Sequence, residues 1–133
     1  MTLFYPLKQT TLHIPGTGPA HDSGRGHLFI VLTSPDAQEE VLCVSISSVY
    51  VKCDETCVLS KGDHDFIKHD SFVFYALTKK YTVKHLRDRV NDGDVTYKGL
   101  ISEEIYETIC DGLLDSRLSP PWAMAYFNEN ASN

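Results

Sequence analysis

Apolar residues form short, nearly continuous runs in the first half of the chain, separated by polar turns. The runs at 27–34 (HLFIVLTS) and 41–51 (VLCVSISSVYV) are rich in β-branched residues, as is typical of strands buried on both faces. A third short strand is predicted at 53–59. A fourth is predicted at 70–77, where DSFVFYAL combines aromatic and β-branched side chains. Strands with such short connections predict a closed or coiled antiparallel sheet.

Two segments precede the first buried run. Residues 3–14 alternate polar and apolar side chains and are predicted to be extended. Residues 15–26 (PGTGPAHDSGRG) contain four Gly and two Pro among small polar residues, so they predict a loop. A loop of this length in a small domain is often functional.

The last third of the chain has helical periodicity. Thr82 precedes a helix predicted at 83–92, and residues 93–100 are predicted to be a connection. Ser102 is the predicted N-cap of a second helix, with two glutamates in its first turn, where the helix dipole favours acidic groups. That helix is predicted to end at 119–121, where Ser-Pro-Pro disfavours helix, and the tail after Phe127 is predicted to fray.

These elements predict one α+β domain spanning residues 1–133: a small, strongly curved antiparallel sheet or barrel with C-terminal helices. The chain is 42% apolar, which is ordinary for a globular protein. No apolar run approaches the roughly 20 residues that cross a bilayer, and the N-terminus lacks a signal-peptide layout. We therefore expect a cytoplasmic protein without a membrane partner.

Charge and cysteine content limit the possible ligands. The net charge is −6, which weakens a general nucleic-acid interpretation because phosphate binding depends on Lys and Arg. Five of the twelve basic residues lie in 79–89, as either a solvated helix face or a phosphate-tracking patch. Cys53 and Cys57 do not form a CxxC pair, so we expect neither zinc nor any other cofactor, and reduced, structural cysteines.

Polar side chains capable of acid–base chemistry adjoin the predicted strands. His27 lies where the glycine-rich loop meets the first buried strand, and Arg25 precedes it by two residues. Ser47 interrupts the second strand, and His64 lies in the turn GDHDF. Each has a structural explanation on its own, but guanidinium, imidazole and hydroxyl groups together suit a phosphate and proton transfer.

The layout resembles the MazF/PemK toxins. The segments that carry the resemblance are the glycine-rich loop, HLFIVLT (27–33), SISS (45–48), DSFVFY (70–75) and GLISEEIYETICDGL (99–113). The resemblance covers about residues 15–116 and implies an SH3-like barrel. It aligns the family's catalytic Arg with His27 and its catalytic Thr with Ser47. GDHDFIKHDSFVFY, with its two histidines, has no close counterpart in the better-known members.

The resemblance also implies a function. It implies metal-independent cleavage of single-stranded RNA, in which the ribose 2′-hydroxyl attacks the adjacent phosphate, together with an antitoxin partner and a homodimer. We hypothesise His27 and His64 as the base and acid, order unassigned, with Arg25 holding the phosphate and Ser47 donating a hydrogen bond to it. The residues predicted to bind substrate are His69, Ser71, Tyr75, Lys79 and Lys80.

Two alternatives remain open from the sequence. The first is a non-catalytic module that binds nucleic acid or protein, which the acidic charge and the His at the family's Arg position favour. The second is a metal site built from His27, His64, His69 and a carboxylate, Asp63 or Asp70. The spacing of His64 and His69 in a predicted turn rather than on a helix gives that second alternative little support.

Overall fold

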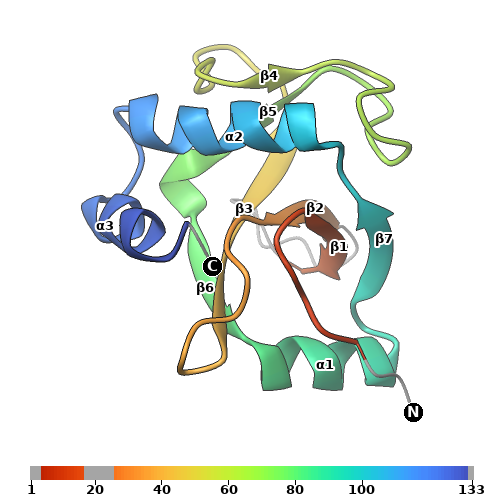
Figure 1. Ribbon diagram of the computed structural model, residues 1–133. Helices are drawn as coiled ribbons and strands as arrows, with labels where there is room; N and C mark the ends of the chain where they lie inside the picture. The colour runs from red at the N-terminus through yellow and green to blue at the C-terminus, as the bar shows by residue number, and fades with distance from the viewer. Residues whose placement is uncertain (1–3, 17–25, 132–133) are drawn as a thin grey trace.

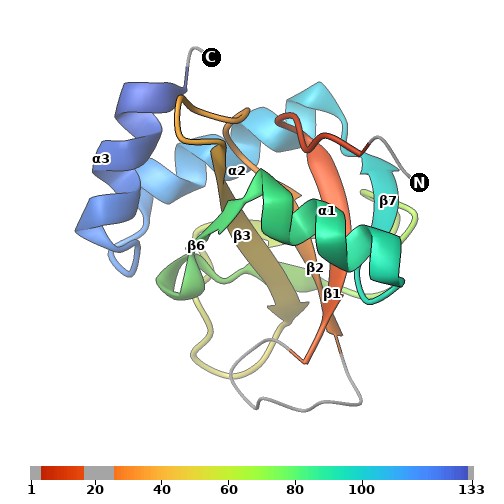
Figure 2. The ribbon, with the colours of Figure 1, turned by 90° about the horizontal axis from the view of Figure 1, so that it is seen from below.

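The computed structural model describes residues 4–16 and 26–131. It confirms the α+β class: an antiparallel sheet carries helices on both faces (Figures 1 and 2). The strands are β1 (Thr10–Pro15), β2 (Gly26–Val31), β3 (Glu40–Ser48), β4 (Val58–Leu59), β5 (Ser71–Val73), β6 (Lys79–Thr82) and β7 (Thr96–Leu100). The helices are α1 (Val83–Asp92), α2 (Glu103–Asp115) and α3 (Pro121–Asn130), with a 3-10 turn, η1, at Tyr75–Leu77.

The long strand β3 organises the sheet. The order of the strands is β4-β5-β3-β2-β1-β7. Strands β5 and β6 pair with the same edge of β3: β6 pairs with the first residues of β3 and β5 with its last residues. Within the described residues the two outer strands, β4 and β7, do not pair with each other, so the sheet is open. The antiparallel sheet is thus confirmed, but it does not close into the barrel that the strand spacing and the family resemblance led us to expect.

Strand alternation divides the apolar residues between two cores. On one face of the sheet, Leu28 and Ile30 of β2 pack with the buried residues of α2 and α3. On the other face, Phe29 and Val31 pack with Leu86 of α1. Because successive strand residues point to opposite faces, one short strand serves both cores, which explains why its sequence is continuously apolar.

Both predicted helix starts are confirmed by their caps. The Thr82 hydroxyl accepts a hydrogen bond from the backbone N–H of His85 at 3.0 Å, and the Ser102 hydroxyl accepts one from Ile105 at 3.3 Å. Gly93, at φ 85°, ends α1 in the left-handed conformation that glycine adopts without a Cβ penalty. None of the helices in the described ranges is long and apolar enough to cross a membrane.

Three elements were not predicted from the sequence. β6 lies within the basic run and β7 within a predicted connection; both are largely exposed and so lack a buried apolar pattern. α3 begins at Pro121, at the prolines that were interpreted only as a stop, because proline at the first helical position is also a common start. The fourth predicted strand is shorter than expected, since its second half forms η1.

Helix α3 is anchored to the turn before β3 through Asp36. The Tyr126 hydroxyl donates to the Asp36 carboxylate at 2.6 Å, and the backbone N–H groups of Gln38 and Glu40 donate to the same carboxylate at 2.9 Å. Desolvation alone would raise the pKa of Asp36, but these hydrogen bonds bring it below the ordinary value. The ionised form of Asp36 therefore helps to hold α3 in place.

Candidate functional site

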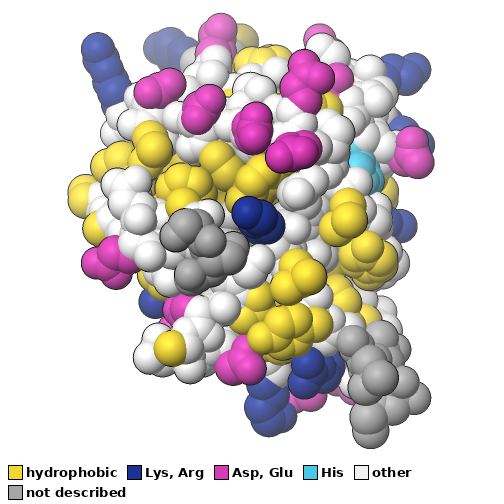
Figure 3. Space-filling view, viewed as in Figure 1, with side chains coloured by type: hydrophobic (Ala, Val, Ile, Leu, Met, Phe, Trp, Pro, Cys, Tyr) yellow, Lys and Arg dark blue, Asp and Glu magenta, His cyan; other side chains and the backbone are white. Residues whose placement is uncertain are grey.

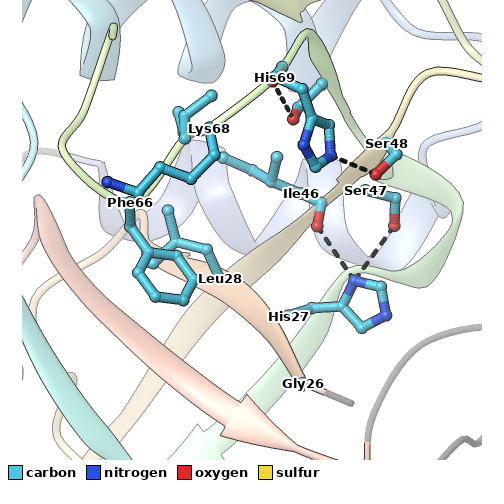
Figure 4. A pocket seen from close by; sticks show the side chains of 11 residues that line it. Gly26, His27, Leu28, Ile46, Ser47, Ser48, Phe66, Lys68 and His69 are labelled. Atoms are coloured by element: carbon cyan, nitrogen blue, oxygen red, sulfur yellow. Dashed lines mark hydrogen bonds between the residues drawn. The ribbon is translucent and has the colours of Figure 1, made fainter. Parts of the chain in front are cut away.

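A cleft of about 390 Å³ lies where β2 begins and β3 ends (Figure 4). Its polar lining consists of His27, Ser47, Ser48, Lys68, His69 and Ser71. Apolar side chains from β2, β3 and the segment before β5 complete the wall. Its volume falls within the roughly 300–1,000 Å³ of typical ligand sites. The cleft brings four of the predicted site residues together: His27, Ser47, His69 and Ser71.

The His27 ring is oriented by residues near the end of strand β3. Its Nδ1 lies 3.2 Å from the backbone oxygen of Ile46 and 3.4 Å from the Ser47 hydroxyl (Figure 4). Since a carbonyl oxygen only accepts, Nδ1 carries the hydrogen and Nε2 keeps its lone pair in the neutral ring. No described residue is hydrogen-bonded to Nε2, so this nitrogen can take a proton from a ligand.

The His69 ring approaches the same strand end from the segment before β5. Its Nε2 lies 2.5 Å from the Ser48 hydroxyl, and both side chains are exposed. The Ser71 hydroxyl donates to the backbone oxygen of His69 at 2.9 Å, which fixes the backbone just before β5. The His69 imidazole is thus accessible and already hydrogen-bonded to a hydroxyl group, as it would be to an oxygen of a substrate.

The two imidazoles reach the cleft from opposite faces of the sheet. His27 and Ser47 have the strand parity of the residues that pack against α1, whereas Ser48 has the parity of those that pack against α2. β3 ends at Ser48 and β2 begins at Gly26, so the cleft continues round the strand ends. A ligand that contacted both rings would cross the end of the sheet.

His64 does not line this cleft. Its Nδ1 accepts a hydrogen bond from the backbone N–H of Phe66 at 3.0 Å, and its Nε2 lies 3.0 Å from the backbone oxygen of Lys98. The Thr11 hydroxyl oxygen is a further neighbour of Nε2, at 3.3 Å. Both ring nitrogens are therefore engaged by the protein, and the structure does not place His64 opposite His27 as an acid–base partner.

Three predicted substrate-binding residues lie elsewhere. Tyr75 is completely buried and its hydroxyl donates to the backbone oxygen of Ile109 at 2.7 Å, so no substrate reaches it in this conformation. Lys79 and Lys80 lie on β6, away from the cleft lining. The Lys80 ammonium is paired with Glu40 at 3.6 Å and covers the ring of Tyr126. These placements correct the expectation that all three line the site.

Arg25, the predicted phosphate ligand, lies outside the described residues. In the basic run 79–89, Lys84 pairs with Asp88 at 2.7 Å and Arg89 pairs with Asp94 at 2.9 Å. Its first two lysines lie on β6 and its other three basic residues lie on α1, so the run is divided between a strand and a helix, and none of it lines the cleft.

Sequence reasoning missed Lys68 and Phe66 as cleft residues. Both belong to the segment FIKHDSF, and the available signal was their adjacency to His69. His13 was also missed: its ring lies against Gly26 so closely that a Cβ there would overlap it, and its centroid lies 5.3 Å from that of Phe66, with the two rings tilted by 59°. Desolvation, then the nearby charges of Lys98 and His27, lower the pKa of His13.

The surface charge restricts where a polyanion binds. Acidic side chains follow the exposed face of α2, visible as a row across the molecule in Figure 3; they are Glu103, Glu104, Glu107, Asp111 and Asp115. This face repels phosphate, whereas the cleft carries Lys68 and two titratable imidazoles. The cleft is therefore the more favourable of these two surfaces for an anionic ligand.

The described residues contain no group of three or more His, Cys, Asp or Glu side chains placed to hold a metal ion. The four cysteines are buried and free, as expected. No protein-family model matches the sequence, and no curated protein matches it either. The resemblance to MazF/PemK toxins therefore depends on the short segments named above.

Proposed function

We propose that the protein is an endoribonuclease that cleaves single-stranded RNA at the strand-end cleft without a metal ion, as the MazF/PemK resemblance implies. The observation that carries the proposal is the presence of two imidazoles, His27 and His69, with hydroxyl groups and Lys68 around one open cleft. Cleavage by 2′-hydroxyl attack needs a base, an acid and positive charge at the phosphate, and these residue types supply all three.

The geometry favours specific roles. His27 is the base, because its Nδ1 hydrogen is directed to Ile46 and its Nε2 lone pair is left for the 2′-hydroxyl proton. His69 is the acid, protonating the leaving 5′-oxygen. In this proposal an oxygen of the substrate takes the place of the Ser48 hydroxyl beside His69. Lys68 stabilises the phosphoryl oxygens. The products are a 2′,3′-cyclic phosphate and a 5′-hydroxyl end, so protons and charges balance without another reactant.

The test is incubation of the purified protein with single-stranded RNA in EDTA, followed by identification of the product ends. Replacing either His27 or His69 by Ala should lower kcat by about 10²–10⁴-fold, as expected for loss of one general acid or base. His85→Ala, which removes an exposed imidazole of α1 outside the cleft, is the matched control and should cleave at the parental rate. Absence of cleavage by the parent protein would refute the ribonuclease proposal.

A non-catalytic RNA-binding module is the second candidate function. It is favoured by the approach of the two rings from opposite faces of the sheet, because the contacts of His27 with Ser47 and of His69 with Ser48 lie on opposite faces of β3. In the same EDTA experiment, retention of RNA without any cleavage product supports this binding module.

The resemblance implies two protein partners, an antitoxin and a second copy of the chain. In support of a second copy, β7 is an edge strand in the described part of the sheet, with Tyr97 and Leu100 exposed on it. Light scattering of the purified protein tests this partner: a mass of one chain at all concentrations would exclude the homodimer.

A further inference from the structure

The His64 side chain links the segment that builds one wall of the cleft to the far edge of the sheet. It lies in the connection from β4 to β5, residues 60–70, which supplies Phe66, Lys68 and His69 to the cleft. Its ring contacts β1 through Thr11 and the backbone of β7 at Lys98. The ring is therefore located between the site segment and two strands that contribute nothing to the cleft.

The hydrogen bonds determine which ring nitrogen carries the hydrogen. The Phe66 N–H donates to Nδ1, so Nδ1 has the lone pair and Nε2 has the hydrogen. The Nε2–H group donates to the backbone oxygen of Lys98. The Thr11 hydroxyl gives its own hydrogen to the backbone oxygen of Gly99 at 2.8 Å, so its oxygen is free to accept from Nε2–H as well. One neutral tautomer satisfies the whole network.

The other backbone hydrogen bonds of this segment are local except at its end, where the N–H of Val49, just after β3, donates to the backbone oxygen of Asp70 at 3.3 Å. The N–H of Gly62 donates to Ile67 at 3.1 Å, and the N–H of Ile67 donates to His64 at 2.9 Å. The local bonds shape the segment, and the bond to Asp70 ties its last residue to the end of β3. The buried Ile67 side chain anchors it in the core, which fixes one point. The middle of the segment is tied to β1 and β7 by two side chains. The Phe66 ring lies 5.3 Å from the His13 ring and under the Lys98 ammonium, and the His64 ring is hydrogen-bonded to the same two strands.

We propose that His64 is a positioning residue: it holds segment 60–70 so that His69 meets Ser48 and Lys68 faces the cleft. The catalytic consequence rests on the proposed ribonuclease function, whereas the positioning itself does not. Displacing a catalytic group by about 1 Å can lower the rate by about 10²-fold. Loss of the His64 ring should therefore reduce kcat without removing any group that contacts the substrate.

Two variants and one control test this role. His64→Ala removes both ring contacts. His64→Asn keeps an acceptor for the Phe66 N–H, because asparagine readily accepts from the N–H two residues on, but is too short to replace Nε2. His85→Ala is the control for loss of an imidazole elsewhere. The readouts are hydrogen exchange of the Phe66 amide, and kcat and KM for RNA cleavage.

We expect His64→Ala to speed exchange of the Phe66 amide by about 10-fold or more and to lower kcat by about 10–100-fold, with KM changed less than about 3-fold. His64→Asn should protect the Phe66 amide better than His64→Ala and still show a reduced kcat. Exchange and kcat at parental values in His64→Ala would overturn the proposal. So would a reduced kcat with unchanged exchange, because His64 would then act on the substrate directly.

Two further outcomes remain informative. If the parent protein does not cleave RNA, the proposed function fails, but the exchange of the Ile67 and Lys68 amides, which do not donate to the His64 ring, still decides whether His64 positions the segment. If His64→Ala loses its cooperative thermal transition, His64→Asn decides instead. A folded His64→Asn protein with the kcat of the parent, and with unchanged exchange of its Ile67 and Lys68 amides, would contradict a positioning role for the contact with β7.

Discussion

Replacing Gly112 by Ala tests the packing of α2 against the sheet. A Cβ at Gly112 would overlap the Tyr75 hydroxyl oxygen and would lie 2.8 Å from the adjoining ring carbon. Tyr75 cannot swing away, because its ring is completely buried and its hydroxyl is bonded to the backbone oxygen of Ile109. Helix propensity alone would make the substitution stabilising by about 1 kcal/mol, so packing and propensity predict opposite signs.

The expected net effect is destabilising. Overpacking a rigid core costs roughly 1–3 kcal/mol, and a contact with both hydroxyl and ring places Gly112→Ala near the upper end. After the propensity gain, we expect a loss of about 2 kcal/mol in the free energy of unfolding, or roughly 5–10 °C in Tm for a domain of this size. The measurement is denaturant and thermal unfolding followed by circular dichroism.

A double-mutant cycle shows whether the Tyr75 hydroxyl is the cause. Tyr75→Phe alone should cost about 1 kcal/mol for the lost hydrogen bond, but in the Gly112→Ala background it should cost nothing or restore stability. Asp111→Ala, at an exposed neighbouring position on α2, is the control and should change stability little. A Gly112→Ala protein with a raised Tm would refute the reasoning, since only the propensity term would then remain.

Three further outcomes are expected. Because Lys68, His27 and His69 are the basic side chains among the described residues of the cleft, log K for RNA should fall with log salt with a slope of roughly −0.7 to −1.4 in a filter-binding titration; a slope several times steeper would indicate a second basic surface. Tyr126→Phe should lower the free energy of unfolding by about 1–2 kcal/mol at neutral pH. Since the pKa of Asp36 is lowered in the folded state, this loss should shrink as the pH falls below about 3.9, which urea unfolding at several pH values checks. Gly26→Ala should destabilise by about 1–3 kcal/mol in thermal unfolding, and His13→Ala should relieve only part of that loss, because the added Cβ would also lie 2.9 Å from the backbone oxygen of Ile14.

The elements that could be predicted from the sequence are those that are buried on both faces or that begin at a recognisable cap. β2 and β3 are apolar because both faces are buried, and α1 and α2 begin at hydroxyl caps that are recognisable in the sequence. β6 and β7 were missed because their side chains are mostly exposed, and strand pairing there depends on backbone hydrogen bonds that leave no apolar pattern. The open sheet was also not predictable, since strand spacing does not show which edges meet.

The site was predictable in composition but not in geometry. His27 and Ser47 were predicted to converge, and they do lie next to each other. The antiparallel pairing of β2 with β3 brings the first residues of β2 beside the last residues of β3. His64, and not His69, was predicted to be the acid–base partner of His27. His64 and His69 lie five residues apart in one segment. Only the folded segment shows that the His64 ring turns toward β1 and β7 while His69 turns toward Ser48.

The most direct test of the cleft is nuclear magnetic resonance of the histidine rings during titration with a single-stranded oligonucleotide whose 2′-hydroxyls are replaced by hydrogen, so that it cannot be cleaved. If one substrate spans the end of the sheet, the ring signals of His27 and His69 shift together, with the same dissociation constant, while those of His85 do not move. A shift of only one of the two cleft rings, or of neither, would contradict the account.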